Sequence, residues 1–379
     1  MSLDNTMKKL PKISIVAASL GALLLSGCAG NATTAEGEEL DLTALNVDSE
    51  QEAELQQLYD SAIESGDTAV TIYAGHHDEF QAIYDAFEDR FPGLSVVPEV
   101  YVGAELQTAL EAERQSGNHV VDVLSNPNAD RYAEQGFAEE YEPVTFAMPD
   151  WAEGKISPDQ IEDPEGFYYA PWALMFSSSY NTDLLEEQDL PASWNDLADE
   201  EWAGEITFMD PSIPGGTMTV STTLLQDGVV DEDWLVDVGE NAQIVAQDQL
   251  ALQSVSSGEF AYQPLSASAS VLNAQQDGAP VEVQFFDENN VIATEKWMLA
   301  ANAPSGDAAK LLLSYLFTYE SQEKTLDAGN FPINQDEDLT SPHGWPSLEE
   351  ASFVELPPQD HMREKMTEYD ELFRSVTGQ

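Results

Sequence analysis

The chain has 379 residues and a formal net charge of -58, from 71 acidic and 13 basic side chains. A chain of this length suits two domains, and its 42% of apolar residues are enough to fill proper cores. The strong negative charge argues against nucleic acid or an anionic membrane face as a partner, because like charges repel each other.

The N-terminal segment has the pattern of a secretory signal. Three lysines precede a short apolar run over residues 13–25, which is shorter than the about 20 residues that a bilayer span needs. The run ends in Leu-Ser-Gly-Cys, which resembles the lipobox of bacterial lipoproteins, and Cys28 is the only cysteine. The resemblance implies cleavage before Cys28 and lipid attached to it. Residues 1–27 are thus interpreted as a signal peptide, and the protein is expected to be lipid-anchored at the outer face of the cytoplasmic membrane.

Residues 28–48 are small, polar and acidic, which predicts a disordered tether. Beyond it, helix and strand patterns alternate with short connections, as in an α/β domain with a mostly parallel sheet. Ligands bind beyond the carboxyl ends of such strands, so the loops 74–78 and 125–128 are candidate site elements. The expected strands are 69–73, 94–101 and 120–124, and the expected helices are 49–64, 79–90, 104–116 and 129–135.

The second half carries further strand-to-helix junctions. Residues 167–180 are apolar and aromatic and predict buried strands that pass toward a second domain. A strand at 206–208 leads through two glycines into a helix, whose free N–H groups would suit a negative ligand atom. A strand at 260–262 precedes a run of serines that opens another helix. The remaining expectations are a strand at 296–301 and helices at 307–319, 322–328 and 359–376.

Several fragments in this order resemble an extracellular solute-binding protein of an ABC importer. They include Thr71-Ile72-Tyr73 before His77, Ala170-Pro171-Trp172-Ala173, Tyr180-Asn181-Thr182-Asp183-Leu184, Trp202-Ala203-Gly204-Glu205-Ile206 and Phe331-Pro332-Ile333. More narrowly, the chain is similar to the ferric-iron-binding-protein-like group, which also holds phosphonate and sugar-phosphate binders. The resemblance runs from about residue 55 to residue 334.

The resemblance implies a two-lobed fold of the periplasmic-binding-protein type II. Each lobe would be a mixed, mostly parallel α/β sheet flanked by helices, with crossing strands as a hinge. Residues 49–166 and 285–335 are expected to form lobe 1, residues 167–284 lobe 2, and residues 336–379 a tail with a packing helix. The protein would act as a monomer that delivers its ligand to the permease and ATPase subunits of the importer.

A small polar or anionic solute, such as a phosphonate or a phosphate ester, is the predicted ligand, because hydroxyls and helix starts suit such groups. Competing interpretations are a satisfied turn at His77, capped helix starts at the glycines and serines, and a core position for Trp172. The predicted ligand-binding residues are His77, Ser125, Asn126, Trp172, Gly215, Gly216, Thr217, Ser266 and Ser268.

Ferric iron is the alternative ligand, carried as cargo rather than as a cofactor. His77 matches the histidine that ferric binders of this group typically place after the first strand. The adjacent tyrosines of those proteins have no counterpart, since residues 265–270 read Leu-Ser-Ala-Ser-Ala-Ser. His77 is therefore the one candidate metal ligand.

An envelope-anchored hydrolase is the alternative from a different class. Ser321 and Lys324 have the Ser-x-x-Lys spacing of penicillin-binding enzymes. No Lys-Thr-Gly follows, and the Gly-x-Ser-x-Gly and His-Glu-x-x-His motifs are missing. The sequence therefore favours a binding protein over an enzyme.

Overall fold

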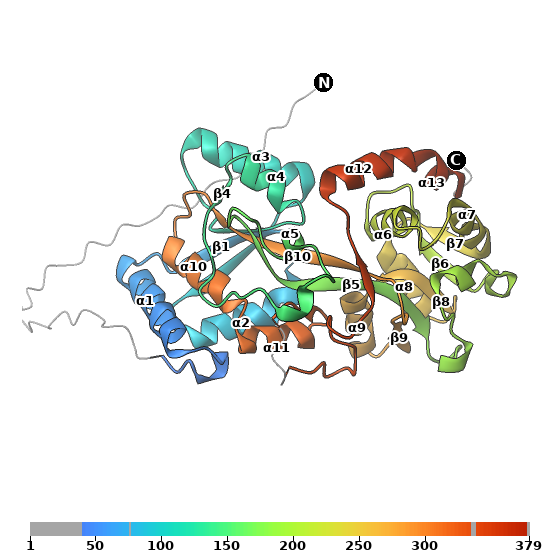
Figure 1. The fold of residues 1–379 in the computed structure, drawn as a ribbon, viewed down its shortest axis with the longest axis horizontal. Helices are drawn as coiled ribbons and strands as arrows, with labels where there is room; N and C mark the ends of the chain where they lie inside the picture. Colours follow the sequence, from blue (N-terminus) through green and yellow to red (C-terminus); the bar gives the residue numbers. More distant parts are fainter. Residues whose placement is uncertain (1–39, 76, 335–338, 377–379) are drawn as a thin grey trace, which may run out of the picture. The chain divides into compact units, whose positions relative to one another are not determined.

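Two long strands, β5 and β10, lie at the centre of one mixed sheet (Figure 1). They pair antiparallel, from Val291 opposite Phe176 to Trp297 opposite Tyr169. The order through the sheet is β2-β1-β3-β10-β5-β8-β6-β7, so β10 leads to one outer set of strands and β5 to the other. Within each outer set the strands are parallel. The strands of this path are β1 (Ala69–Ala74), β2 (Ser95–Val100), β3 (Val123–Ser125), β5 (Tyr169–Asn181), β6 (Ile206–Met209), β7 (Ala242–Val245), β8 (Tyr262–Ala267) and β10 (Asn290–Ala300).

The computed structural model describes residues 40–75, 77–334 and 339–376. The predicted signal peptide and Cys28 lie outside these residues. Within them, no helix has the length and apolar character that a membrane crossing requires.

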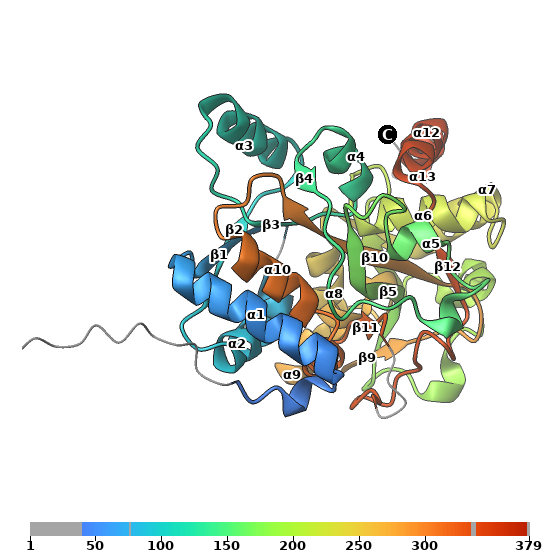
Figure 2. The same cartoon turned by 60° about the vertical axis from the view of Figure 1, so that its left-hand side comes forward.

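The first hydrophobic core packs against β1, β3 and the first residues of β5. Its opening helix α1 begins with a capping box, in which Asp48 accepts the N–H groups of Glu50 and Gln51 and the Gln51 side chain accepts the N–H of Asp48. Figure 2 shows α1 lying along α10 over this side of the sheet. The helices that pack on this face are α1 (Ser49–Ser65), α2 (Gln81–Arg90), α10 (Gly306–Tyr315) and α11 (Tyr319–Asp327). The helices α3 (Gly103–Ser116) and α4 (Ala129–Glu134) pack in a separate core on the other face, with Tyr73 and Leu124.

The second core surrounds β6 and β8 and includes the C-terminal tail. Met362 and Phe373 of the tail are buried in it, as their helical spacing predicted, and α12 and α13 pack on α6 and α7 (Figure 1). A side chain at Gly239 would collide with Val376, so α7 and α13 are in close contact. The helices of this core are α6 (Gly216–Gln226), α7 (Glu232–Asn241), α12 (Gln359–Glu368) and α13 (Asp370–Val376). The helices α8 (Asp248–Ser256) and α9 (Ser268–Gln276) pack in a separate small cluster through Val255 and Val271.

Short elements complete the described part of the fold. The short strands and helix are β4 (Ala138–Glu139), β9 (Val281–Gln284), β11 (Phe331–Pro332), β12 (Phe353–Glu355) and α5 (Pro158–Ile161). The 3-10 turns are η1 (Thr43–Leu45), η2 (Asp78–Phe80), η3 (Asp150–Ala152), η4 (Glu187–Asp189), η5 (Trp194–Ala198) and η6 (Glu200–Trp202).

The structure differs from the sequence-based prediction in several places. The tail helix expected at 359–376 divides into α12 and α13, and the strand expected at 296–301 begins at Asn290. The strand expected at 260–262 continues to Ala267, because its ladder with β5 extends the strand through a serine-rich stretch of weak strand propensity. The helix expected at 307–319 ends at Tyr315, since a turn separates α10 from α11. The predicted tether over 28–48 is too long, because Leu42 and Leu45 are buried in the first core.

The first turn of α9 meets the chain at Gly329 in close contact. Ser268 donates a hydrogen bond from its hydroxyl to the Gly329 carbonyl at 3.1 Å. Gly329 has a positive φ of 81°, and a Cβ there would lie 3.1 Å from the Cα of Ala269 and 2.9 Å from a methyl group of Leu272. Only glycine fits this combination without strain, and the contact ties the start of α9 to the end of α11.

We expect Gly329→Ala to lower the free energy of unfolding by about 1–3 kcal/mol, because alanine disfavours the left-handed region and crowds the backbone of α9. Urea denaturation monitored by tryptophan fluorescence measures the loss. Gly306→Ala is the matched control, since Gly306 has open space around it and an ordinary φ. That variant should be neutral or slightly stabilised. Equal effects at the two positions would show that the contact at Gly329 does not constrain the fold.

Candidate ligand-binding site

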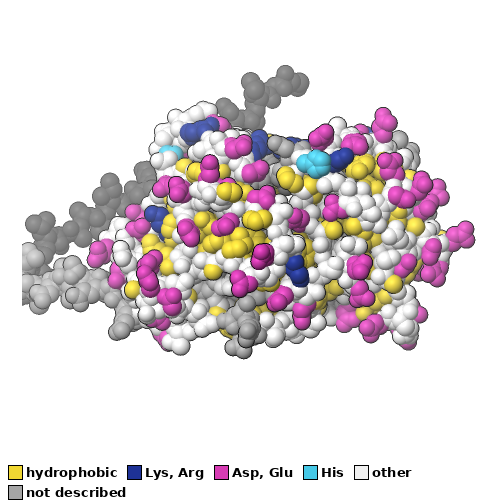
Figure 3. Space-filling model, viewed as in Figure 1, with side chains coloured by type: hydrophobic (Ala, Val, Ile, Leu, Met, Phe, Trp, Pro, Cys, Tyr) yellow, Lys and Arg dark blue, Asp and Glu magenta, His cyan; other side chains and the backbone are white. Residues whose placement is uncertain are grey.

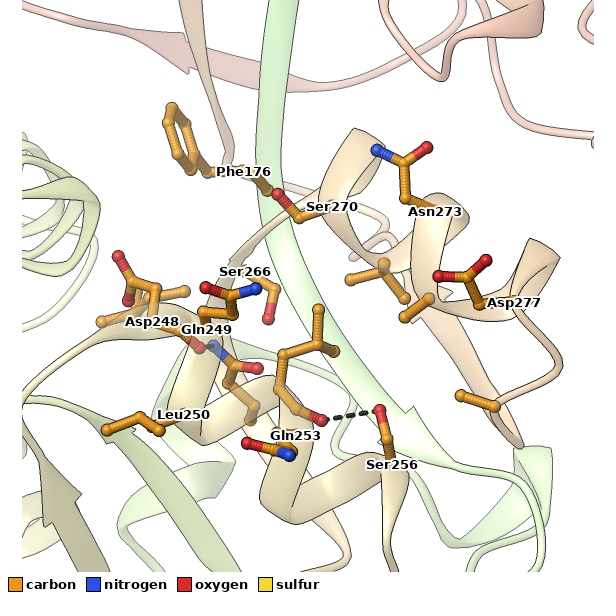
Figure 4. A pocket seen from close by; sticks show the side chains of 17 residues that line it. Phe176, Asp248, Gln249, Leu250, Gln253, Ser256, Ser266, Ser270, Asn273 and Asp277 are labelled. Carbon is orange, nitrogen blue, oxygen red and sulfur yellow. Dashed lines mark hydrogen bonds between the residues drawn. The ribbon is translucent and has the colours of Figure 1, made fainter. Parts of the chain in front are cut away.

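A cavity of about 890 Å³ opens between α8 and α9, over the carboxyl end of β8 (Figure 4). Figure 4 shows Asp248 and Gln249 on one side, Asn273 and Asp277 on the other, and Ser266 between them. Its walls combine carboxylates, amides and hydroxyls with apolar side chains. The polar lining residues are Asp248, Gln249, Gln253 and Ser256 of α8, Gln263 and Ser266 of β8, and Ser270, Asn273 and Asp277 at α9.

The end of β8 is bulged at the cavity wall. Ser177 lies opposite Ser266 while Ser178 lies opposite Pro264, so Leu265 is an extra residue in this strand. Leu265 has a φ of 64°, a left-handed conformation that is unfavourable for a bulky side chain. The bulge sets the direction of Ser266, whose hydroxyl lies 3.0 Å from that of Ser179.

Asp248, the first residue of α8, lies against the start of α6. The Thr217 hydroxyl donates to Asp248 Oδ1 at 3.0 Å. Asp248 Oδ2 lies 3.4 Å from the position that a Cβ on Gly216 would take. Burial raises the pKa of the Asp248 carboxyl, and the hydrogen bond from Thr217 opposes that shift. The glycine-rich start of α6 thus holds a carboxylate of the chain itself.

Three of the predicted ligand-binding residues lie at the carboxyl ends of β1 and β3, and each forms hydrogen-bond contacts with other residues of the protein. His77 is 7% exposed, and its ring nitrogens lie 3.0 Å from the Tyr84 hydroxyl and 3.0 Å from the Glu99 carbonyl. Ser125 donates from its hydroxyl to the buried Glu295 carboxylate. The third residue, Asn126, donates its backbone N–H to the Lys296 carbonyl of β10 at 3.0 Å.

The six predicted residues that follow Asn126 in the chain divide between the cavity and the core. Ser266 lines the cavity, and Gly216 and Thr217 border it through their contacts with Asp248. The remaining three pack elsewhere, and none of them lines the cavity. Gly215 packs on Met209, Ser268 bonds to Gly329, and Trp172 is fully buried with ring centroids 5.1 Å from Phe80 and 5.4 Å from Trp297.

Sequence reasoning missed the side of the cavity wall that α8 forms, because it assigned no element between residues 226 and 256. Asp248, Gln249 and Gln253 belong to this missed set. A signal was present: Ala242-Gln243-Ile244-Val245 is a short strand pattern, and Ala251 and Val255 repeat at helical spacing behind Asp248. This is one more strand-to-helix junction, like those at residues 74–78 and 125–128 that the sequence analysis treated as candidate site elements.

The residues of the hydrolase alternative do not form a site. Ser321 is fully buried within α11. The ammonium of Lys324 lies 3.5 Å from the Asp327 carboxylate at the surface. In the part of the chain that the structure describes, no group of three or more His, Cys, Asp or Glu side chains could hold a metal ion.

Comparison with models of known protein families assigns the chain to a family. A model of the bacterial extracellular solute-binding proteins matches residues 82–347. The chain belongs to this family. This match confirms the family predicted from the sequence, whose members bind solutes.

Curated relatives are distant but similar over most of their length. A probable ABC transporter periplasmic-binding protein, y4fP of Sinorhizobium fredii, is 24% identical over 59% of this chain and 70% of its own. The major ferric iron-binding protein of Neisseria meningitidis serogroup A is 23% identical over 70% of this chain and 81% of its own.

Solved structures share the fold. Iron-bound HitA from Pseudomonas aeruginosa has a TM-score of 0.61 at 19% identity and covers 82% of this chain and 99% of its own. AfuA from Actinobacillus pleuropneumoniae, solved with fructose-6-phosphate, has a TM-score of 0.60 at 18% identity over 81% of this chain and 98% of its own. These matches confirm the predicted two-lobed, periplasmic-binding-protein-like α/β fold.

We expect Asp248→Asn to be more stable than the wild type at pH 7. Burial raises the folded-state pKa of this carboxyl, so its ionised form destabilises the folded protein, whereas asparagine keeps an oxygen acceptor for Thr217 without charge. The difference should shrink as pH falls through the raised pKa and vanish below the ordinary value of 3.8. Urea denaturation between pH 3.5 and about pH 7 measures it.

Asp277→Asn is the control for this pH series, because Asp277 lies on the exposed rim of the same cavity. Its stability should run parallel to that of the wild type. A gap between Asp248→Asn and the wild type that stays constant over the whole pH range would contradict the assignment of the cost to a buried carboxylate.

Proposed function

We propose that the protein is the solute-binding component of an ABC importer, which captures a small polar solute and delivers it to a membrane permease driven by ATPase subunits on other chains. The observation that carries this proposal is the cavity of about 890 Å³ at the carboxyl end of β8, in a chain of the solute-binding family. The edge beyond the carboxyl ends of parallel strands is where α/β sheets bind ligands. The relative from Sinorhizobium fredii carries the same description in its name.

The lobe division predicted from the sequence fits this mechanism. Lobe 1, over residues 49–166 and 285–335, would contribute the polar cluster around His77, Ser125 and Glu295. Lobe 2, over residues 167–284, contributes the cavity, with the tail over 336–379 packed on it. Hinge closure at β5 and β10 would bring the two sets of polar groups around a bound solute, a mode known for such proteins.

Two solute classes have support beyond the cavity itself. A phosphonate or phosphate ester is the ligand predicted from the sequence, and AfuA was solved with such an ester. Ferric iron is the second candidate cargo, because the Neisseria relative and HitA carry iron in their names. Either class would have to be bound by the residues described above, with His77 as the candidate iron ligand.

Native mass spectrometry of protein purified from its host should show one retained small molecule. Adding the identified solute at 100 times its dissociation constant should stabilise the protein by about 2.7 kcal/mol. Replacing Gln253 and Asn273 together by alanine removes two amides from the cavity wall and should abolish retention. Gln243→Ala, an exposed amide outside the cavity, should retain the solute. A protein that retains nothing and is stabilised by no solute would contradict the proposal.

We further propose that the protein works as a monomer anchored through lipid on Cys28. Cys28→Ser should move it from the membrane fraction to the soluble extracellular fraction, because the thiol that carries the lipid is lost. Detergent phase partition and intact mass measure the change. Asn31→Ser, three residues farther along, should stay membrane-bound. If the Cys28→Ser protein remained in the membrane fraction, the proposed lipid anchor would be contradicted, while the proposed solute binding would still stand.

A further inference from the structure

The cavity lies in a part of the chain that has no positive side chain. Between Lys155 and Lys296 the sequence contains no lysine, arginine or histidine. Every residue that lines the cavity lies within this interval. Its polar groups are therefore carboxylates, amides and hydroxyls, of which the carboxylates attract cations and repel anions.

The helix start that would suit an anion has a carboxylate of the chain beside it. Free N–H groups at the start of α6 would attract a phosphate, as helix starts commonly do. The Asp248 carboxylate lies beside that helix start, with the Thr217 hydroxyl donating to it at 3.0 Å and Gly216 next to it. A phosphate bound there would lie within a few ångströms of the negative charge of Asp248. Because this carboxylate is partly buried, water and salt screen the repulsion poorly.

Asp248 itself lacks a counter-charge. It is partly buried, its hydrogen-bond donor in the described structure is the neutral hydroxyl of Thr217, and no ion pair there includes it. Buried carboxylates are normally paired, because an unpaired charge away from water is costly. An ammonium group on a ligand would supply the missing partner, and Phe176 adds an aromatic ring to the same wall.

The nearest base in the sequence is engaged elsewhere. Lys296 lines a separate cavity of about 90 Å³ together with Asp130 and Asp159. Its ammonium lies 5.0 Å from the centre of the Tyr168 ring. On the lobe 1 side, the crossing strand β10 carries the buried acidic residue Glu295, which accepts a hydrogen bond from Ser125 at the end of β3. Hinge closure would thus bring further negative charge toward the solute.

We propose that the cavity takes a small organic cation, whose amino group pairs with the Asp248 carboxylate while the amides and hydroxyls of the walls bind the rest of the molecule. This inference rests on the proposed function as a solute-binding protein and specifies its substrate class. Gln253 and Ser266 each present an oxygen that can accept an N–H or O–H from such a molecule. A phosphate ester would find no positive side chain in this lining.

Isothermal titration of the full chain with putrescine, spermidine, ethanolamine and choline tests the inference. At least one amine should bind with one-to-one stoichiometry. Asp248→Asn should weaken that binding about 10- to 100-fold, because it removes a charge-assisted hydrogen bond. Asp237→Asn, which removes the same charge from the exposed face of α7 in the same lobe, should leave the affinity within about twofold.

Glucose 6-phosphate, glucose and ferric citrate form the comparison set in the same titrations. If no amine binds, or if an amine binds equally well to wild type and Asp248→Asn, the inference is overturned. Binding of the phosphate ester, the sugar or iron instead of an amine also overturns it, but leaves the proposed solute-binding function standing. The proposed function fails separately, by the absence of any retained or stabilising solute in the native protein. Melting curves of each variant confirm that it is folded.

Discussion

The antiparallel pairing of β5 with β10 is the constraint on which the rest of the structure depends. Each strand contributes side chains to more than one core, and the two outer sets of strands join the pair through β3 on β10 and β8 on β5. Buried polar groups tie the pair further. Ser177 of β5 bonds to Asn290 of β10 at 3.0 Å, and Asn290 also donates to the Ser352 carbonyl in the tail. A shift of this register by one residue would move each of these groups to the wrong face.

The cavity gathers features that would be unfavourable in an ordinary core. Leu265 adopts a left-handed backbone conformation, and Asp248 keeps a partly buried carboxylate with a raised pKa. Strain and desolvated charge of this kind persist where the surrounding structure holds them, and they cluster at functional sites. Asp248 belongs to α8 and Leu265 to β8, and both line the cavity. Their coincidence around one cavity is the main physical reason to place ligand binding there.

The surface of the protein and the lining of the cavity both carry negative charge. Figure 3 shows acidic side chains over the whole visible face, with few basic ones among them. Such a field attracts cations and repels anions at long range, although salt screens it beyond about 8–10 Å. Selectivity in the cavity then depends on short-range contacts such as those of Asp248, which screening affects much less. A cationic solute is therefore favoured at both distances.

Local patterns predicted most of the element types and, through the order of short motifs, the family. The helix from Ser49, the buried strand before His77 and the tail helices all depend on residues close in sequence, so periodicity was enough to predict them. Only the tertiary structure decided the site. Thr217 meets Asp248 across 31 residues and Ser268 meets Gly329 across 61, while Trp172 is buried by rings from other elements. Such long-range contacts depend on how strands pair and helices pack, and sequence spacing alone does not encode that arrangement.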